Sequence, residues 1–302
     1  EDVARRDFTC NMLLRNISSD EVIDMVGGVE DIKNGMLRSH PAVDVNKTFA
    51  DDPLRMIRGA RFAGKYNFKV DHDVFKAMHD NAHRIEIISQ ERISAELIKL
   101  MEIGKLHGAL KTLDGCGILK HIMPEVVAMQ GVFHDLEAPY HRECGGDVFG
   151  HVMLVLENAQ PGVVNQLAAL FHDIGKPKAR KVGENGKVSF KMHEPIGNRM
   201  VVDILKRMKF DNVTIDKVSK LVMMHTRPHQ FGKWSNSSDK ALRKLIREAG
   251  DELDQLLMLA RADSLGNHPV EDYIPALRER IAVLRDNAER PINKQPFING
   301  GM

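Results

Sequence analysis

Apolar residues recur at helical spacing along most of this 302-residue chain. Two stretches show the pattern clearly: Ala95, Leu97, Ile98, Leu100 and Met101, and later Val201, Val202, Ile204, Leu205 and Met208. Spacings of three and four residues place these side chains on one face of a helix, which must then be buried. Strand-like runs are few, namely residues 3–13 and residues 187–190 after the turn sequence Gly-Glu-Asn-Gly. The sequence therefore predicts a mainly α fold.

Length and charge limit the functional classes. A chain of 302 residues corresponds to about two domains. Its 43 basic and 42 acidic residues give a net charge of +1, and aromatic residues make up 5%, so a nucleic acid would have to be held by a local basic patch. Cys10, Cys116 and Cys144 lie far apart without a paired motif, which is typical of a reducing cytoplasm. No stretch approaches the roughly 18 apolar residues of a membrane span.

Histidine and aspartate residues stand out in the second half. They occur in five pieces: His151, the adjacent pair His172 and Asp173 in LAALFHDIGKP, His193 in HEPIG, His225 in MMHTRPH, and Asp263 in RADSLGN. Imidazole and carboxylate groups bind Mn, Fe, Ni, Co or Zn, and carboxylates also bind Mg. A lone histidine on an apolar helix is usually a hydrogen-bonded core residue, but burying this whole set without a metal would be costly. The pattern predicts a metal site within a helical bundle.

This arrangement, with HDIGKP intact, resembles the HD phosphohydrolase superfamily over about residues 147–290. The resemblance implies that four residues are the core metal ligands: His151, His172, Asp173 and Asp263. His193 and His225 match the additional histidines of members that use a second metal. His229 and His268 match no family position, and we expect them at the surface or behind the ligands.

The resemblance also implies catalytic roles. A bound metal lowers the pKa of a water molecule and polarises the phosphoryl oxygen. His172 and Asp173 would form the catalytic centre, with Asp173 bridging metals or orienting the water, and Lys176 would contact phosphate. Lys178, Arg180 and Lys181 extend this basic loop, although a solvated run of charges explains the outer residues equally well.

The first half opens with EDVARRDFTCN, in which Arg5 and Arg6 offer planar donors for phosphate or a base edge and Asp7 could orient one of them. Three further segments follow at residues 23–38, 49–63 and 88–100. Together the four resemble, in order and spacing, the class II tRNA nucleotidyltransferases, which are the CCA-adding enzymes and their poly(A) polymerase relatives. The matching family patterns are RRDFTxNA, GGxxDLxxGxLR, EDxxR and ERIxxEL.

In that family the EDxxR element selects the incoming CTP or ATP in place of a nucleic-acid template. The resemblance places this role on Asp51, Asp52 and Arg55, with Asp52 and Arg55 on one helical face and Asp51 where the family usually has Glu. Arg58 and Arg61 would reach triphosphate or the tRNA backbone, or would be structural. Residues 24–38, with Gly27, Gly28 and Gly35, match a lever that moves when specificity switches, and Glu91, Arg92 and Glu96 would brace the nucleotide site.

One family element has no match in this chain. Nucleotidyl transfer needs two Mg²⁺ ions held by a DxD pair on a strand after a GGxVRD-like loop. The family places both elements upstream of RRDFT, so we expect an N-terminally truncated sequence whose Mg²⁺ ligands lie outside it. The predicted domains are the end of an α/β nucleotidyltransferase head at residues 1–22, a helical nucleobase-selecting neck and tRNA-binding body at 23–140, and a helical HD-domain bundle at 141–302.

The expected function is therefore a CCA-adding tRNA nucleotidyltransferase with a metal-dependent phosphatase or 2′,3′-cyclic phosphodiesterase in its HD domain. The alternatives are a stand-alone HD phosphohydrolase and a tRNA-binding subunit of a separately encoded head. A poly(A) polymerase fits less well, because the HD domain accompanies CCA addition. The expected partners and cofactors are tRNA, CTP and ATP, a homodimeric partner, Mg²⁺ for transfer, and Ni²⁺, Mn²⁺, Co²⁺ or Fe²⁺ for the HD domain.

Overall fold

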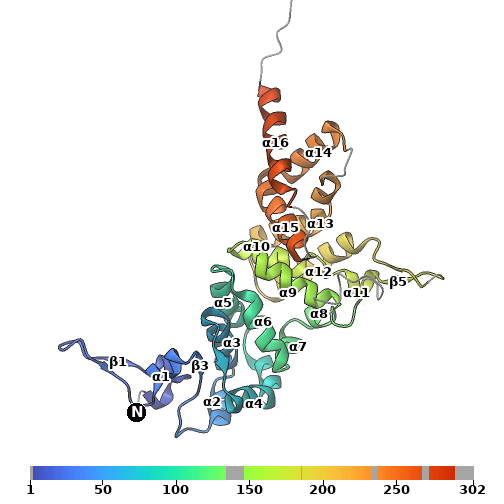
Figure 1. Cartoon of the computed structure of the whole chain (residues 1–302). Helices are drawn as coiled ribbons and strands as arrows, with labels where there is room; N and C mark the ends of the chain where they lie inside the picture. Colours follow the sequence, from blue (N-terminus) through green and yellow to red (C-terminus); the bar gives the residue numbers. More distant parts are fainter. Residues whose placement is uncertain (1–2, 134–145, 185, 233–236, 267–271, 290–302) are drawn as a thin grey trace, which may run out of the picture.

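Helices build nearly all of the regular structure (Figure 1), which confirms the mainly α fold. The computed structural model describes residues 3–133, 146–184, 186–232, 237–266 and 272–289. The helices of the first half are α1 (Gly28–Lys33), α2 (Val45–Asp51), α3 (Leu54–Tyr66), α4 (His72–Asp80), α5 (Gln90–Met101), α6 (Leu106–Gly115), α7 (Leu119–Ile122) and α8 (Pro124–Val127). Those of the second half are α9 (Val148–Asn158), α10 (Val163–Phe171), α11 (Lys176–Ala179), α12 (His193–Arg207), α13 (Asn212–Met224), α14 (Asp239–Ala249), α15 (Leu253–Gly266) and α16 (Ile274–Glu289).

Short strands form three pairs among the described residues. They are β1 (Leu14–Arg15) antiparallel to β2 (Val22–Ile23), β3 (Met36–Leu37) parallel to β4 (Lys69–Val70), and β5 (Lys181–Val182) antiparallel to β6 (Val188–Ser189). Short 3₁₀ helices lie at Val3–Arg5, Thr9–Asn11, Ala82–Ile87, Pro228–Phe231 and Gly250–Glu252. The strand expected within residues 187–190 is confirmed as β6, the second strand of a hairpin.

The strand expected over residues 3–13 is wrong. This segment instead forms two 3₁₀ turns, Val3–Arg5 and Thr9–Asn11. Polar side chains explain the difference, because they bond to the nearby backbone. Arg6 donates from Nη1 to the Asn11 carbonyl oxygen at 2.7 Å, and Asp7 Oδ1 accepts from the Phe8 N–H and the Asn11 amide, both at 3.1 Å. Such local bonds replace the ladder that a strand would need.

One hydrophobic core runs through the molecule from Phe8 to Leu284. In Figure 1, α3 to α7 lie in the middle and α13 to α16 lie above them. The two groups meet where α5 contacts α10 and α6 contacts α9. No helix in the described ranges has both the length and the apolar composition to cross a membrane. The predicted domain boundary near residue 140 falls in residues 134–145, outside the described ones, and stays a prediction.

Helices α3 and α6 cross with their backbones almost in contact. A Cβ added at Gly64 would lie 2.8 Å from the Ala109 nitrogen, and one added at Gly108 would lie 3.1 Å from Gly64 Cα. The first distance is shorter than real Cβ atoms show and the second is tighter than most of their contacts, so glycine at these positions permits the close crossing. The crossing fixes α3, the helix that carries Arg55 and Arg58.

Candidate metal centre and arginine-lined cavity

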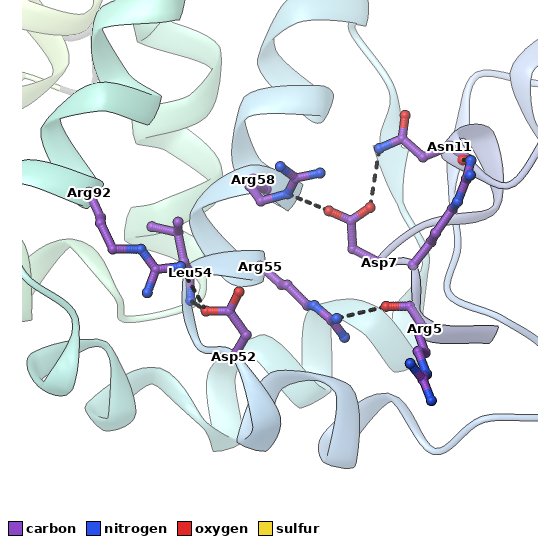
Figure 2. Close-up of a pocket in the computed structure, with 9 residues that line it drawn as sticks. Arg5, Asp7, Asn11, Asp52, Leu54, Arg55, Arg58 and Arg92 are labelled. Atoms are coloured by element: carbon purple, nitrogen blue, oxygen red, sulfur yellow. Dashed lines mark hydrogen bonds and ion pairs between the residues drawn. The ribbon is translucent and has the colours of Figure 1, made fainter. Parts of the chain in front are cut away.

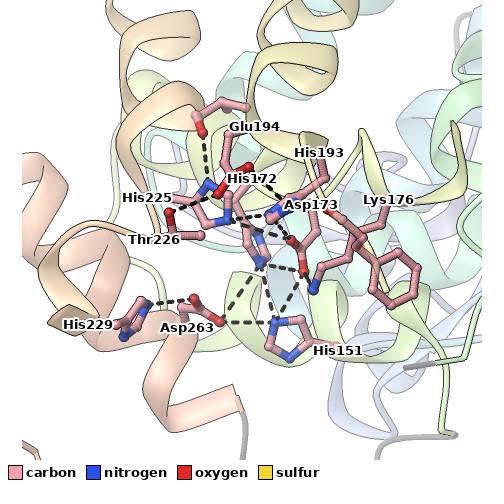
Figure 3. Close-up of polar contacts among 12 residues, drawn as sticks. His151, His172, Asp173, Lys176, His193, Glu194, His225, Thr226, His229 and Asp263 are labelled. Carbon is pink, nitrogen blue, oxygen red and sulfur yellow. Dashed lines mark hydrogen bonds and ion pairs between the residues drawn. The ribbon is translucent and has the colours of Figure 1, made fainter. Parts of the chain in front are cut away.

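The six predicted metal ligands come together in the second half of the chain, as Figure 3 shows. His151 lies on α9 and Asp263 on α15, while His172 and Asp173 follow the end of α10. His193 begins α12 and His225 caps the end of α13. The ligands form two triads, His151, His172 and Asp263, and Asp173, His193 and His225, with candidate ligand atoms within 4.8 Å of one another in each.

Three of the histidines share one local arrangement that fixes their tautomer. The Nδ1 atoms of His172, His193 and His225 lie 2.8, 2.9 and 2.7 Å from the carbonyl oxygen of the residue three positions earlier. A carbonyl oxygen can only accept, so Nδ1 carries the proton in each ring. The Nε2 lone pair of each neutral ring is therefore left for another partner, as in metal-binding histidines.

The ring nitrogens face one another across each triad. His172 Nε2 lies 3.2 Å from His151 Nε2, and His193 Nε2 lies 3.3 Å from His225 Nε2. When both atoms of a pair are acceptors they repel, so the space beside them suits a cation, either a proton or a metal ion. Burial lowers the pKa of His172, but Asp173 and Asp263 outweigh burial and raise it. The donor set, four imidazoles and two carboxylates, fits divalent transition metals.

Asp173 stands between the two triads. Its Oδ2 lies 3.3 Å from His172 Nε2, while its Oδ1 lies 3.5 and 3.6 Å from the Nε2 atoms of His193 and His225. Lys176 Nζ binds the same carboxylate at 2.5 Å. Burial would raise the pKa of Asp173, but Lys176 and His172 hold it well below its usual value. The carboxylate is therefore ionised and able to bridge two cations.

Sequence reasoning missed a chain of contacts behind Asp263. His229 Nε2 lies 2.9 Å from Asp263 Oδ2, and the Tyr273 hydroxyl lies 2.8 Å from His229 Nδ1. His229 thus supports a candidate ligand, one of the two roles expected for it, whereas His268 lies outside the described residues. The role of Tyr273 could not be predicted from the sequence, because the residue belongs to no motif and lies far along the chain from His229.

A second site lies in the first half of the chain. It is a cavity of about 520 Å³, a size typical of small-molecule sites, and Figure 2 shows the residues that line it. Its lining residues are Arg5, Arg6, Asp7, Asn11, Asp52, Leu54, Arg55, Arg58 and Arg92. The five arginines outnumber the two carboxylates, so the cavity suits an anionic ligand.

Contacts within this cavity fix the orientation of several arginines. Arg58 Nε binds Asp7 Oδ2 at 2.5 Å; the Asp7 carboxylate is buried, whereas the Arg58 side chain is 34% exposed. Arg55 Nη2 donates to the Arg5 carbonyl oxygen at 2.7 Å. Arg55 Nη1 donates to the Thr48 carbonyl oxygen at 3.5 Å. These contacts tie α3 to the first 3₁₀ turn, more than 40 residues earlier in the sequence.

Asp52 and Arg55 do not share a helix, which corrects the expected geometry. Helix α2 ends at Asp51, Asp52 is extended with φ −144° and ψ 95°, and α3 begins at Leu54. Pro53 explains the break, because a proline disfavours helical backbone in the residue before it. Asp52 nevertheless lines the cavity with Arg55, and its Oδ1 lies 3.4 Å from Arg92 Nη2.

Two of the expected nucleotide contacts lie away from the cavity. Arg61 binds Glu96 at 2.6 Å, and the two side chains are 13% and 7% exposed. Asp51 is exposed and absent from the cavity lining. The structure therefore brings together Arg5, Arg6, Asp7, Asp52, Arg55 and Arg58, and separates Asp51 and Arg61 from them.

The expected lever at residues 24–38 begins with a tightly held turn. The Asp24 carboxylate accepts the backbone N–H groups of Val26, Gly27, Gly28 and Val29, and these bonds lower its pKa. Gly27 and Gly35 have φ of 81° and 62°, a region that favours glycine. The turn defines where α1 starts, and a lever motion stays a prediction.

Three family models match consecutive parts of the chain. Residues 1–38 match the poly A polymerase head domain, residues 67–129 the probable RNA and SrmB-binding site of polymerase A, and residues 148–266 the HD domain. The last range contains all six candidate metal ligands.

Curated relatives and solved structures agree with these matches. The multifunctional CCA protein of Chromobacterium violaceum is 33% identical over 91% of this chain and 68% of its own length. That of Vibrio parahaemolyticus is 27% identical over 100% of this chain and 73% of its own length. The crystal structure of the Bacillus stearothermophilus CCA-adding enzyme in complex with CTP shares the fold, with a TM-score of 0.59, 20% identity, and coverage of 94% of this chain and 59% of that one.

The matches to a polymerase head domain and an HD domain, together with the relatives, place the chain in an enzyme class, the nucleotidyltransferases that carry an HD domain. Within that class, the chain belongs to the family of multifunctional CCA proteins.

Proposed function

We propose that this chain selects the incoming nucleotide in a CCA-adding tRNA nucleotidyltransferase. The arginine-lined cavity carries this proposal, because it joins Asp52 and Arg55 of the base-reading motif to arginines from the first turn of the chain. The Asp52 carboxylate would accept from the exocyclic amine of cytosine or adenine, and Arg55 would donate to ring or carbonyl acceptors. A wrong base would leave these groups unpaired, at a cost of about 1–3 kcal/mol each.

Nucleotide binding tests this assignment without requiring transfer. Calorimetry with CTP, ATP, UTP and GTP should show tighter binding of the first two. Arg55→Ala should reduce that preference about tenfold, the equivalent of one lost base contact. Arg247→Ala serves as the control, since it removes an exposed arginine on α14. An unchanged preference in Arg55→Ala would show that another element reads the base.

The second part of the proposal concerns the HD domain, which we assign as a metal-dependent phosphatase or 2′,3′-cyclic phosphodiesterase. The two triads, bridged by Asp173, carry this assignment. Bound divalent cations would lower the pKa of a water molecule and polarise the phosphoryl oxygen. In cyclic phosphate hydrolysis the water oxygen bonds to phosphorus, one phosphorus–ribose oxygen bond breaks, and the ribose oxygen gains the proton that water loses. Lys176, which binds Asp173, would donate to a phosphate oxygen.

Hydrolysis of 2′,3′-cyclic AMP with Ni²⁺, Mn²⁺, Co²⁺ or Fe²⁺ tests the assignment. His172→Ala and Asp173→Ala should each abolish turnover, while circular dichroism checks that they fold. Lys240→Ala, an exposed lysine on α14, should retain it. Undiminished turnover in both ligand variants would remove the assignment.

We also propose tRNA, CTP and ATP as partners, Mg²⁺ as the transferase cation and the cytoplasm as the location. The family match at residues 67–129 supports the RNA partner. Incubation of this chain with Mg²⁺, CTP, ATP and tRNA lacking its 3′ end tests where the Mg²⁺ ligands lie. We expect no addition, because the sequence contains no strand-borne DxD pair after a GGxVRD-like loop. Addition by the chain alone would show that carboxylates within it hold Mg²⁺.

A further inference from the structure

The β5–β6 hairpin is attached at both ends to the candidate metal centre. On the leading side, Lys176 binds Asp173 and opens the short helix α11 that runs into β5. On the trailing side, the Phe190 carbonyl oxygen accepts from His193 Nδ1 at 2.9 Å, just after β6. The Lys176 Nζ also lies 5.7 Å from the centre of the Phe190 ring, which joins the two ends of the hairpin. Figure 1 shows the hairpin projecting away from the bundle.

The charge of this segment differs sharply from that of the chain. Residues 176–191 contain one acid, Glu184, whereas the whole chain balances 43 basic residues with 42 acidic ones. The basic residues of the segment are Lys176, Lys178, Arg180, Lys181, Lys187 and Lys191. Within the described residues, Arg180, Lys181 and Lys191 are exposed and have no acidic group at ion-pair distance. Folding therefore leaves these charges available to a ligand.

These observations favour an extended polyanion over a single phosphate group. One phosphate at the metal centre needs only the cations beside it, such as Lys176. Cations spread along a projecting hairpin would instead contact successive phosphates of a chain whose end reaches the metal centre. Because aromatic side chains are absent from residues 177–189, binding would depend on the phosphate backbone and not on base stacking.

We propose that the β5–β6 hairpin binds the phosphate backbone of single-stranded RNA and guides its 3′ end into the HD metal centre. This inference rests on the proposed phosphohydrolase function and names its substrate class, an RNA chain ending in a phosphate or a 2′,3′-cyclic phosphate. A free cyclic mononucleotide is then a minimal substrate that uses the metal centre but not the hairpin.

The test compares two triple variants. Arg180→Gln, Lys181→Gln and Lys191→Gln together neutralise the hairpin. Lys206→Gln, Lys240→Gln and Arg247→Gln together remove the same number of exposed lysines and arginines from α12 and α14. One assay measures kcat/KM for 2′,3′-cyclic AMP and for a 12-nucleotide single-stranded RNA with a 2′,3′-cyclic phosphate end. A second measures binding of the same RNA to the metal-free chain by fluorescence anisotropy across a range of salt concentrations.

We expect the native chain and the control variant to prefer the RNA at least tenfold. The hairpin variant should lose this preference and keep its activity on 2′,3′-cyclic AMP. Its salt slope for RNA binding should fall by about 2, since each neutralised phosphate contributes about 0.7 for single strands. Equal kcat/KM on RNA for all three proteins, or an equal loss on both substrates in the hairpin variant, would overturn the proposal.

The binding assay separates this proposal from the phosphohydrolase assignment. If the native chain hydrolyses neither substrate, the assignment fails, and the anisotropy result still decides whether the hairpin binds RNA. Unchanged affinity and salt slope in the hairpin variant would then overturn the RNA contact. A weaker, less salt-dependent interaction in that variant alone would support it.

Discussion

Hydrogen bonds to atoms other than the candidate ligand atoms orient the side chains of the candidate metal centre. The carbonyl acceptors of His172, His193 and His225 hold three rings in one tautomer. Asp263 is oriented from the opposite side, by His229 and Tyr273. Such supporting contacts commonly change metal affinity by about 10- to 100-fold when they are lost.

Tyr273→Phe should therefore weaken metal binding without removing a ligand. The change deletes the hydroxyl that lies 2.8 Å from His229 Nδ1, so the imidazole behind Asp263 loses its anchor. We expect about a tenfold loss of Mn²⁺ affinity, measured by calorimetry on the metal-free protein. Tyr66→Phe is the matched control, because Tyr66 is half exposed and lies on α3. Equal affinity in both variants would show that Asp263 needs no such support.

Glu96 should be among the more sensitive acidic residues of the first half. It is 5% exposed and binds Arg61 at 2.6 Å and Lys99 at 2.8 Å. Glu96→Gln leaves the Arg61 charge poorly compensated, and we expect the free energy of unfolding to fall by about 3 kcal/mol in urea denaturation. Glu91→Gln on the exposed face of the same helix should change it by less than about 0.5 kcal/mol. A similar small change for both would show that the Arg61 pair contributes little.

At the scale of elements, glycines decide how closely segments approach the metal centre. A Cβ added at Gly175 would collide with the His193 carbonyl oxygen and lie 2.7 Å from the Gly197 nitrogen. Gly175 is the glycine of the HDIG motif, which spans residues 172–175, and its close approach to α12 leaves no room for a side chain at this motif position.

Gly175→Ala should separate these elements. We expect a loss of stability of about 2 kcal/mol or more and weaker metal binding, because His193 moves with the start of α12. Thermal unfolding and Mn²⁺ calorimetry measure the two effects. Gly115→Ala is the control, since its added Cβ would lie at an ordinary 3.4 Å from the Phe75 ring. Normal metal affinity in Gly175→Ala would show that α12 can shift without disturbing His193.

Helical spacing was a reliable guide wherever apolar faces decide structure, as in α5 and α12. It failed where single residues override the pattern. Pro53 divides one expected helix into α2 and α3, and polar side chains around Asp7 fold residues 3–13 into turns. The clustering of the candidate ligands could be predicted because their residue types stand out along the chain, and their role as metal ligands stays a prediction. The link from Asp263 through His229 to Tyr273 could not, because it depends on how segments distant in sequence pack together.

At the scale of the whole molecule, the two sites belong to halves that share a core. Besides the helix contacts, Ser94 donates to the Met208 carbonyl oxygen at 2.7 Å, and Arg207 binds both carboxylate oxygens of Glu125 at 2.6 and 2.8 Å. These polar contacts join α5 and α8 of the first half to the end of α12. The pairing of Arg207 with Glu125 is two-pronged and so restricts orientation as well as distance.

The Arg207–Glu125 pair should make the contact between the two halves of the chain sensitive to acid. Burial raises the pKa of Glu125, but the bonds from Arg207 outweigh it and lower that pKa. A lowered pKa means that the contact stabilises the folded chain at neutral pH and loses its effect as pH falls through the folded-state value. A double-mutant cycle of Glu125→Gln and Arg207→Gln should give a coupling of about 0.5–1 kcal/mol at pH 7 that declines once the pH falls below the ordinary glutamate pKa and through the lowered folded-state pKa. A coupling that stays constant with pH would show that charge is not involved.

The position of Asp173 between the two triads bears on how such a site can change during evolution. Because its Oδ1 faces His193 and His225 while its Oδ2 faces His172, each side of one carboxylate serves a different triad. A lineage that replaced His193 and His225 would lose the second triad and keep the first, made of His151, His172 and Asp263, complete. Two substitutions at the start of α12 and the end of α13 would thus be enough to turn a site with two candidate triads into a site with one.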